Sequence, residues 1–356
     1  MTKPRARDLG LPFPGEPGPL NAITDIAGLS VGLCTLTDPE RDIRTGVTAI
    51  LPRPEHEAMP VWAGLHVLNG NGEMTGTHWI RDAGHFLGPV MITSTHGVGA
   101  VHTGATRWMI DHYRDHFHGE HHAWAMPVVA ETYDGVLNDI NAMVLRPEHA
   151  IAALEARATG PVPEGATGGG NGMIAYEFKA GTGTASRRVR IDRDTFTVGA
   201  LVQANHGLRD WLTILGRPVG RLMPEGAFRH QETGSIIVIL ATDAPLSAPG
   251  LRHLARRAAM GVARGGTPGG NNSGDIFLAL STANPAPMPQ VAPAFATRVE
   301  LSMERLDPVY LAAVEAVEEA VVNAIVAGED TPTVHPRGHL CRGIDRARLA
   351  AIFAGG

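Results

Sequence analysis

Arg264-Gly-Gly-Thr-Pro-Gly-Gly-Asn-Asn-Ser-Gly-Asp275 runs directly into the apolar segment Ile276-Phe-Leu-Ala-Leu280. Four glycines and a proline from Gly265 to Gly270 free the backbone to adopt positive φ and strained turns. The change from loop to apolar run predicts a strand that begins at Ser273 and presents its hydroxyl at the strand's edge. We interpret Ser273 as a nucleophile, and the alternative is a plain glycine-rich turn before a core strand.

A serine beside strained backbone can also attack the carbonyl group that precedes it, here the carbonyl of Asn272. This reaction would cut the chain and leave Ser273 with a free α-amino group. The ordinary pKa of such an amine, about 7.7 to 8.0, suits proton transfer near neutral pH better than that of a lysine. The sequence therefore predicts self-cleavage between Asn272 and Ser273 into an α chain, residues 1–272, and a β chain, residues 273–356.

The segment Gly-Gly-Asn-Asn-Ser-Gly-Asp-Ile-Phe-Leu-Ala-Leu-Ser-Thr-Ala-Asn, residues 269–284, is similar to the self-cleavage site of the DmpA family. That family contains the L-aminopeptidase/D-esterases and the β-peptidyl aminopeptidases. Four other stretches resemble the same family, at residues 5–10, 21–25, 127–135 and 202–207. The resemblance covers most of the chain. It implies an α/β (α+β) fold, a single domain over residues 1–356 built as a four-layer αββα sandwich related to the N-terminal-nucleophile hydrolases.

The composition indicates a globular protein, with 44% hydrophobic and 19% charged residues. A net charge of −6 and the absence of a basic cluster with spaced aromatic residues argue against nucleic acid as a partner. The longest apolar run, residues 236–241, is far shorter than the roughly 20 residues that span a bilayer, and the first residues do not resemble a signal peptide. We expect no membrane partner and a cytoplasmic location. Cys34 and Cys341 are expected to be ordinary thiols.

Apolar runs of strand length alternate with helical segments, which indicates mixed α and β structure; the strand-like runs are 89–93, 127–130, 197–202 and 235–241. Ser247 is a predicted N-cap for a helix through Arg264. Asp307 and Pro308 predict the start of a second helix that stops at Gly328. The glycine-rich residues 160–183 are expected to be the loosest stretch of the chain.

Two polar residues follow apolar runs and are candidates for the site. Asn205 follows the run 197–202 just before Gly207, so it can cap its own turn or donate a hydrogen bond to an oxyanion. Glu131 follows the run 127–130, and its carboxylate can receive an ammonium group or lie in solvent. The family resemblance implies that Asn205 is the oxyanion donor and that Glu131 holds the amine of the substrate.

The resemblance also implies a Ser-x-Glu pair that orients the nucleophile, and Ser302 and Glu304 match that motif. Two residues apart in an extended chain, they would project to the same side. Glu318 is a rival, because it lies on the apolar stripe of the helix predicted after Asp307 and becomes the candidate carboxylate if Glu304 is remote from Ser273. Residues 69–76 and Met91 resemble stretches that line the family's substrate cleft, although Met91 can equally be a core residue.

Two other patterns do not complete a site. Five histidines crowd residues 112–122, but no carboxylate or cysteine pattern completes a metal shell around them. The glycine clusters 168–172 and 181–184 lack the Lys-Ser/Thr ending of a phosphate loop. We expect neither a metal nor an organic cofactor.

The predicted function is a self-processing serine aminopeptidase that releases N-terminal residues from short peptides, amides or esters through an acyl-enzyme on Ser273. The resemblance implies in addition a homo-oligomer, a tetramer of αβ units. One alternative is an acyltransferase of the ornithine acetyltransferase type, although that family uses threonine as its nucleophile. The other alternative is a non-catalytic binding protein.

Overall fold

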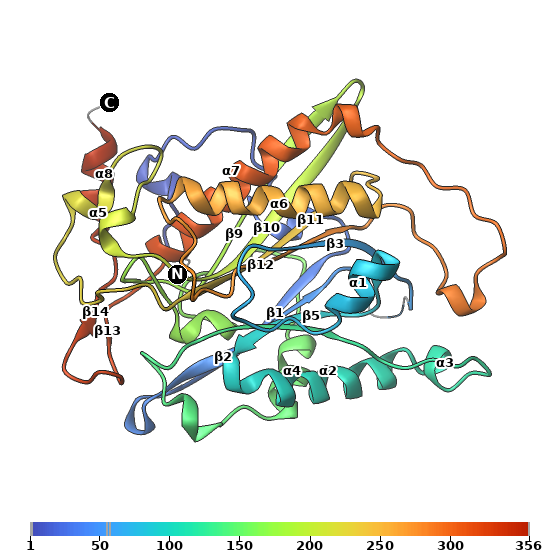
Figure 1. Cartoon of the computed structure of the whole chain (residues 1–356), viewed down its shortest axis with the longest axis horizontal. Helices are drawn as coiled ribbons and strands as arrows, with labels where there is room; N and C mark the ends of the chain where they lie inside the picture. Colours follow the sequence, from blue (N-terminus) through green and yellow to red (C-terminus); the bar gives the residue numbers. More distant parts are fainter. Residues whose placement is uncertain (1–2, 55, 57, 355–356) are drawn as a thin grey trace.

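The secondary structure is arranged in four layers (Figure 1), as seen in a computed structural model that describes residues 3–54, 56 and 58–354. Helices α6 (Ala248–Arg264) and α7 (Asp307–Val326) form one outer layer and pack on a six-stranded sheet. Helices α2 (Val98–His112) and α4 (Pro147–Glu155) form the other outer layer and pack on a four-stranded sheet. The predicted αββα sandwich is confirmed.

The two sheets lie face to face between the helical layers. The six-stranded sheet has the order β4 (His85–Phe86), β3 (Val61–Val67), β12 (Ile276–Ser281), β11 (Ser235–Thr242), β10 (Asp194–Asn205) and β9 (Thr182–Ile191). The four-stranded sheet has the order β1 (Ser30–Asp38), β2 (Ile43–Leu51), β5 (Val90–Ser94) and β6 (Val128–Thr132). The pairs β11–β12 and β5–β6 are parallel, and the other neighbours in both sheets are antiparallel.

Shorter elements connect and flank these layers. The remaining helices are α1 (Thr77–Ala83), α3 (Arg114–Phe117), α5 (Val219–Leu222) and α8 (Arg346–Ala354), and the remaining strands are β7 (Ile174–Ala175), β8 (Phe178–Lys179), β13 (Thr331–Pro332) and β14 (Leu340–Cys341). Within the described residues, no helix has both the length and the hydrophobicity needed to cross a membrane.

The apolar core explains why β11 reads as one continuous hydrophobic run. Its alternate residues point in opposite directions: Ile237 packs between the two sheets, while Ile236 packs under the helices α6 and α7. All eight residues of β11 are buried because both faces of the sheet are covered. The same arrangement holds for β12, where Leu278 faces the other sheet and Phe277 faces the helices.

The two helices that were predicted to begin after Ser247 and at Asp307 are both present. Ser247 is the N-cap of α6, and its hydroxyl accepts a hydrogen bond from the backbone nitrogen of Gly250 at 3.4 Å. Helix α7 begins at Asp307 with a proline in its first turn, and it ends at Val326, two residues before Gly328.

Two expectations about the loops are corrected. The strand β12 begins at Ile276 rather than at Ser273, so that Gly274 and Asp275 separate the serine from the ladder. Residues 168–172 are not loose but form a buried 3₁₀ turn. A Cβ added to Gly169 would lie 2.3 Å from Gln203 Oε1 and 2.5 Å from the carbonyl oxygen of Ile92. Glycine is needed there because the backbone is packed too closely for any side chain.

Candidate active site

Several chain ends meet at one edge of the six-stranded sheet. Strand β10 ends at Asn205, which lies opposite Ser235 at the beginning of the antiparallel strand β11. Because β12 runs parallel to β11, the residues that precede Ile276 lie at this same edge. Strand β3 is antiparallel to β12 and ends opposite Ile276, so that the loop after Val67 also arrives there. The topology thus brings residues from four separate parts of the chain around Ser273.

Ser273 lies at the centre of this edge, held by two hydrogen bonds of its own and by one from the next residue. Its hydroxyl donates to Asp275 Oδ1 at 2.5 Å. Its backbone nitrogen donates to the carbonyl oxygen of Gly270 at 2.9 Å, which closes a tight turn over residues 270–273. The next nitrogen, that of Gly274, donates to Ser235 Oγ at 3.0 Å. Ser273 is only 1% exposed in this uncut chain, whereas residues 271–272 of the same turn are exposed.

The peptide bond before Ser273 carries a hydrogen bond of its own. The carbonyl oxygen of Asn272 accepts from the side-chain amide of Asn71 at 2.8 Å. The amide of Asn69, on the same loop, donates to the carbonyl oxygen of Gly270 at 3.0 Å. Both ends of the turn are therefore fixed by the loop that follows β3.

Asp275 is the carboxylate that the structure brings to Ser273, and the sequence analysis missed it. It is 2% exposed, and besides the serine hydroxyl it accepts a hydrogen bond from the backbone nitrogen of Ile236 at 3.1 Å. Burial raises the pKa of Asp275, and the hydrogen bond from Ser273 partly opposes that rise. One signal was available, because two residues apart in extended chain point to the same side.

Asn205 lies at the same edge, and one of its amide hydrogens has no partner among the residues that the structure describes. Its Oδ1 accepts from the backbone nitrogen of Ile174 at 2.9 Å, and its Nδ2 donates to the carbonyl oxygen of Tyr133 at 2.9 Å. A side-chain amide has two N–H groups, and the bond to Tyr133 uses one of them. Gly207 follows with φ of 84°, which makes the sharp turn that was expected after the strand.

Glu131 is buried close to residues 265–275, the loop between α6 and β12 that carries Ser273 and is called the nucleophile loop below. It belongs to β6, is 4% exposed, and accepts hydrogen bonds from the backbone nitrogen of Glu73 at 3.0 Å and from the hydroxyl of Thr95. A Cβ added to Gly72 would lie 3.1 Å from Glu131 Oε1 and 3.2 Å from the Cα atom of Gly274. Gly72 thus packs closely against both this carboxylate and the residue after Ser273. Burial raises the pKa of Glu131, against the lowering effect of its two hydrogen-bond donors.

A second buried glutamate, Glu232, shapes the nucleophile loop and was also missed. It accepts hydrogen bonds from the backbone nitrogens of Gly207 at 2.5 Å and Gly270 at 3.1 Å. Burial raises the pKa of Glu232, and these two donors oppose the rise. Glu232 therefore ties the turn after Asn205 to the turn before Ser273.

The structure does not bring Ser302 and Glu304 to Ser273, which corrects the motif match. Both are exposed, and the neighbouring Leu301 donates its backbone N–H to the carbonyl oxygen of Pro245 at 2.8 Å. Pro245 follows the carboxyl end of β11, whereas Ser273 precedes the amino end of the parallel β12. The Ser-x-Glu pair thus lies at the opposite end of the sheet, and the long loop that precedes it swings away from the body (Figure 1).

Glu318, the alternative to Glu304 as the carboxylate of the site, forms an ion pair with Arg264. Its Oε2 lies 2.9 Å from Nη1 of Arg264, the last residue of α6, and Glu318 is 5% exposed. The prediction of a buried glutamate on this helix is correct, but its partner is an arginine rather than the nucleophile. The carboxylate beside Ser273 is therefore neither Glu304 nor Glu318.

Met91 is a core residue rather than a wall of the cleft. It is fully buried on β5, on the side of the four-stranded sheet that packs against α2 and α4. Alternation along the strand explains this position, since its neighbour Ile92 faces the other sheet. In the stretch 69–76, Asn69 and Asn71 donate hydrogen bonds to the loop before β12, and Gly72 packs against Glu131 and Gly274.

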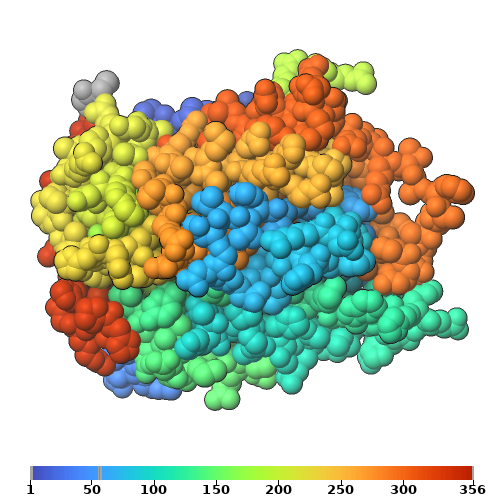
Figure 2. All heavy atoms as spheres, viewed as in Figure 1, coloured from blue at the N-terminus to red at the C-terminus, as the bar shows by residue number. Residues whose placement is uncertain are grey.

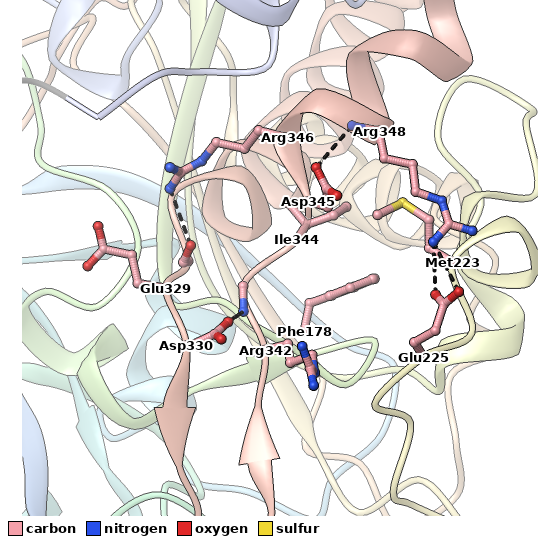
Figure 3. A pocket seen from close by; sticks show the side chains of 12 residues that line it. Phe178, Met223, Glu225, Glu329, Asp330, Arg342, Ile344, Asp345, Arg346 and Arg348 are labelled. Carbon is pink, nitrogen blue, oxygen red and sulfur yellow. Dashed lines mark hydrogen bonds and ion pairs between the residues drawn. The ribbon is translucent and has the colours of Figure 1, made fainter.

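A cavity of about 640 Å³ lies elsewhere and is lined mostly by charged residues (Figure 3). Arg348 is paired with Glu225 at 3.0 Å, Arg346 donates to the carbonyl oxygen of Val326 at 2.8 Å, and Asp330 accepts from a backbone nitrogen at 2.8 Å. Arg348 and Glu225 thus pair with each other, Arg346 and Asp330 bond to the backbone, and none of these residues belongs to the candidate site. Among the described residues, no group of three or more His, Cys, Asp or Glu side chains is arranged to hold a metal ion.

A four-layer αββα sandwich with a serine just before a central strand is the arrangement of the N-terminal-nucleophile hydrolases. Residues 21–338 match the model of peptidase family S58. The chain belongs to this family and is a peptidase.

Two curated relatives are β-peptidyl aminopeptidases named BapA. The protein from Sphingosinicella microcystinivorans is 46% identical over 98% of this chain and 92% of its own length. The protein from Sphingosinicella xenopeptidilytica is 42% identical over 92% of this chain and 86% of its own length. The family resemblance inferred from the sequence is thus confirmed.

Two solved structures have the same fold. The L-aminopeptidase D-Ala-esterase/amidase of Ochrobactrum anthropi, described as a prototype of the serine aminopeptidases and a variant of the Ntn hydrolase fold, is 55% identical with a TM-score of 0.94. The alignment covers 99% of this chain and 98% of that one. A Burkholderia β-aminopeptidase is 44% identical with a TM-score of 0.89 over 99% of both chains.

Proposed function

We propose that this protein is a self-processing serine aminopeptidase that removes N-terminal residues from short peptides, amino-acid amides or esters through an acyl-enzyme on Ser273. The observation that carries the proposal is the site itself. A serine hydroxyl hydrogen-bonded to a carboxylate lies beside a buried glutamate, at a turn where the chain can be cut. The names of the relatives support the substrate class.

The scheme assigns one step to each group. After the chain is cut, the α-amine of Ser273 accepts the proton of the hydroxyl as Oγ attacks the substrate carbonyl. The free N–H of Asn205 donates to the oxyanion. The leaving amine departs with the proton, and a water molecule then hydrolyses the ester on Oγ, which restores the hydroxyl.

Glu131 supports an exopeptidase rather than an endopeptidase. Among the described residues, the donors to this buried carboxylate are Thr95 and the backbone of Glu73, and such a carboxylate gains from the arrival of a positive charge. The free amino group at the start of a peptide supplies that charge. Because Gly72 packs against both Glu131 and Gly274, an amine held by Glu131 places the first carbonyl of the substrate near the nucleophile.

The two alternatives make different demands on this site. An acyltransferase of the ornithine acetyltransferase type would pass the acyl group to an amine acceptor instead of water. That family uses threonine as its nucleophile, and the serine at position 273 therefore argues against this alternative. A non-catalytic binding protein would not need the Asn272–Ser273 bond to be cut.

A cytoplasmic homo-oligomer, a tetramer of αβ units, completes the proposal. The loop of residues 282–302 supports association of copies, since it stands out from the body (Figure 2) and carries Phe295 and Val299 at 93% and 70% exposure. Association of copies would remove these exposed apolar side chains from water, which is favourable.

We expect purified wild-type protein to consist of two fragments, residues 1–272 and 273–356, and to release p-nitroaniline from β-alanyl or L-alanyl p-nitroanilide. Intact-mass spectrometry and a release assay measure the two properties. Ornithine and glutamate are then added as acceptors. A chain that stays whole supports the binding protein, and acyl transfer to ornithine in preference to water supports the acyltransferase.

We expect Asn205→Ala to lower kcat by about 10²- to 10³-fold, because it removes one donor to the oxyanion. The variant also leaves the backbone nitrogen of Ile174 without its partner, so that some stability is lost. Asn323→Ala is a matched control. Asn323 is fully buried and bonds the backbone at Ala6 and Thr184, which makes its loss a cost in stability alone. Equal kcat values for the two variants would remove Asn205 from the scheme.

A further inference from the structure

The proposed function leaves the first cut without a base. In the uncut chain the nitrogen of Ser273 is part of a peptide bond, and its lone pair is delocalised into the carbonyl group. The α-amine that serves the mature enzyme therefore does not exist when the Asn272–Ser273 bond has to be broken. The uncut structure must supply the base and the oxyanion donor from other residues.

Asp275 has the position of the missing base. Its Oδ1 lies 2.5 Å from Ser273 Oγ, close enough for direct proton transfer. Glu232, the next carboxylate at this edge, has both of its oxygens on the backbone nitrogens of Gly207 and Gly270. Of these two buried carboxylates, Asp275 is the one that contacts the hydroxyl.

Asn71 has the position of the oxyanion donor for the cut. Its amide already contacts the carbonyl oxygen of Asn272, the atom on which negative charge develops when the hydroxyl attacks. Asn205 differs, because the part of the chain that the structure describes places its amide on the backbone of Tyr133 and Ile174. The two asparagines thus serve different carbonyl groups.

We propose that the precursor cuts itself with a constellation distinct from that of the mature enzyme, in which Asp275 is the base and Asn71 is the oxyanion donor. The proton of Ser273 Oγ passes to Asp275 while a bond forms between Oγ and the carbonyl carbon of Asn272. When the C–N bond breaks, Asp275 gives that proton to the departing nitrogen, which becomes the α-amine. A water molecule then hydrolyses the ester, restores the hydroxyl and leaves a carboxylate on Asn272.

The cut also removes the constellation that performed it. The new carboxylate of Asn272 is no longer joined to Ser273, and the exposed turn of residues 271–272 is free to leave. Asn71 then has no carbonyl group of the chain to hold. Asn71 acts once in each molecule, during the cut between Asn272 and Ser273, whereas Asn205 acts in every catalytic turnover.

The test is the rate of processing compared with the rate of turnover. We expect Asn71→Ala to slow the appearance of the two fragments by about 10²-fold, as the loss of an oxyanion donor does. The activity per cut molecule, with cut molecules counted by intact mass, should fall far less. The matched control is Asn271→Ala, which changes an exposed asparagine of the same turn and should process at the wild-type rate.

Asp275→Asn tests the base. We expect it to accumulate as an uncut chain that has the melting temperature of Ser273→Ala, the uncut reference, within a few degrees. Processing of either Asn71→Ala or Asp275→Asn at the wild-type rate overturns the inference, and so does an equal loss of processing and turnover in Asn71→Ala. The inference rests on the proposed self-cleavage, and the two fail differently, because a wild-type chain that never cuts refutes the proposed function itself.

Discussion

Replacing Ser273 with alanine will leave the chain whole at 356 residues and without measurable aminopeptidase activity. Both effects have one cause, since the hydroxyl that attacks the Asn272 carbonyl is also the hydroxyl that attacks the substrate. The variant keeps the buried position and loses only the hydrogen bond to Asp275. Intact mass and the release assay measure the two effects on the same sample.

A matched control for this variant lies on the strand that follows. Ser281 ends β12, is fully buried, and donates its hydroxyl to the carbonyl oxygen of Ala244. Ser281→Ala should cut itself and turn over substrate. Cleavage at the Asn272–Ser273 bond in the Ser273→Ala chain would show that another group is the nucleophile.

Glu131→Gln should lower kcat/KM by about 10²-fold or more for substrates that carry a free amine. Truncating one partner of a buried, hydrogen-bonded charge pair costs about 2–5 kcal/mol, and glutamine keeps the shape while it removes the charge. The sharpest measurement compares β-alanyl p-nitroanilide with propionyl p-nitroanilide, which lacks the amine. The wild type should prefer the first strongly, and the variant should have lost most of that preference.

The acid limb of the pH profile should change in the same variant. Burial raises the pKa of Glu131 above the ordinary value, so that its carboxylate is lost at a higher pH than that of an exposed glutamate. Only the ionised form holds an ammonium group, and kcat/KM should therefore fall as the pH falls through this raised pKa. Glu155→Gln, a change at a partly exposed glutamate that contacts Trp108, is the control and should keep the wild-type profile. An unchanged acid limb in Glu131→Gln would assign that limb to another group.

The sequence was sufficient for those features that are local in the chain. The turn before Ser273, the cap at Ser247 and the buried run of β11 each depend on neighbouring residues, and each was predictable from them. The family resemblance made the overall fold predictable as well. Even so, the start of β12 was placed three residues early, because glycine content shows where a loop lies and not where the ladder resumes.

The contacts of the site were less predictable because they join distant segments. Asn71 and Asn272 are 201 positions apart and meet only because β3 pairs with β12 in an antiparallel register. Ser302 and Glu304 show the opposite case. They match a motif in sequence, but they follow β12, which crosses the sheet and leaves the chain at the end opposite to Ser273. A motif match contains no such distance.

The position of β12 inside its sheet determines how a cut enzyme of this kind would unfold. The strand is hydrogen-bonded to β3 on one side and to β11 on the other. Residues 273–356 therefore contribute an internal strand to a sheet whose other strands come from residues 1–272. Cut molecules that lose this sheet would have to reassemble from two pieces, which makes refolding second order in protein. Heat inactivation of the cut enzyme would then be governed by the rate of unfolding, and its lifetime at high temperature would be a kinetic property.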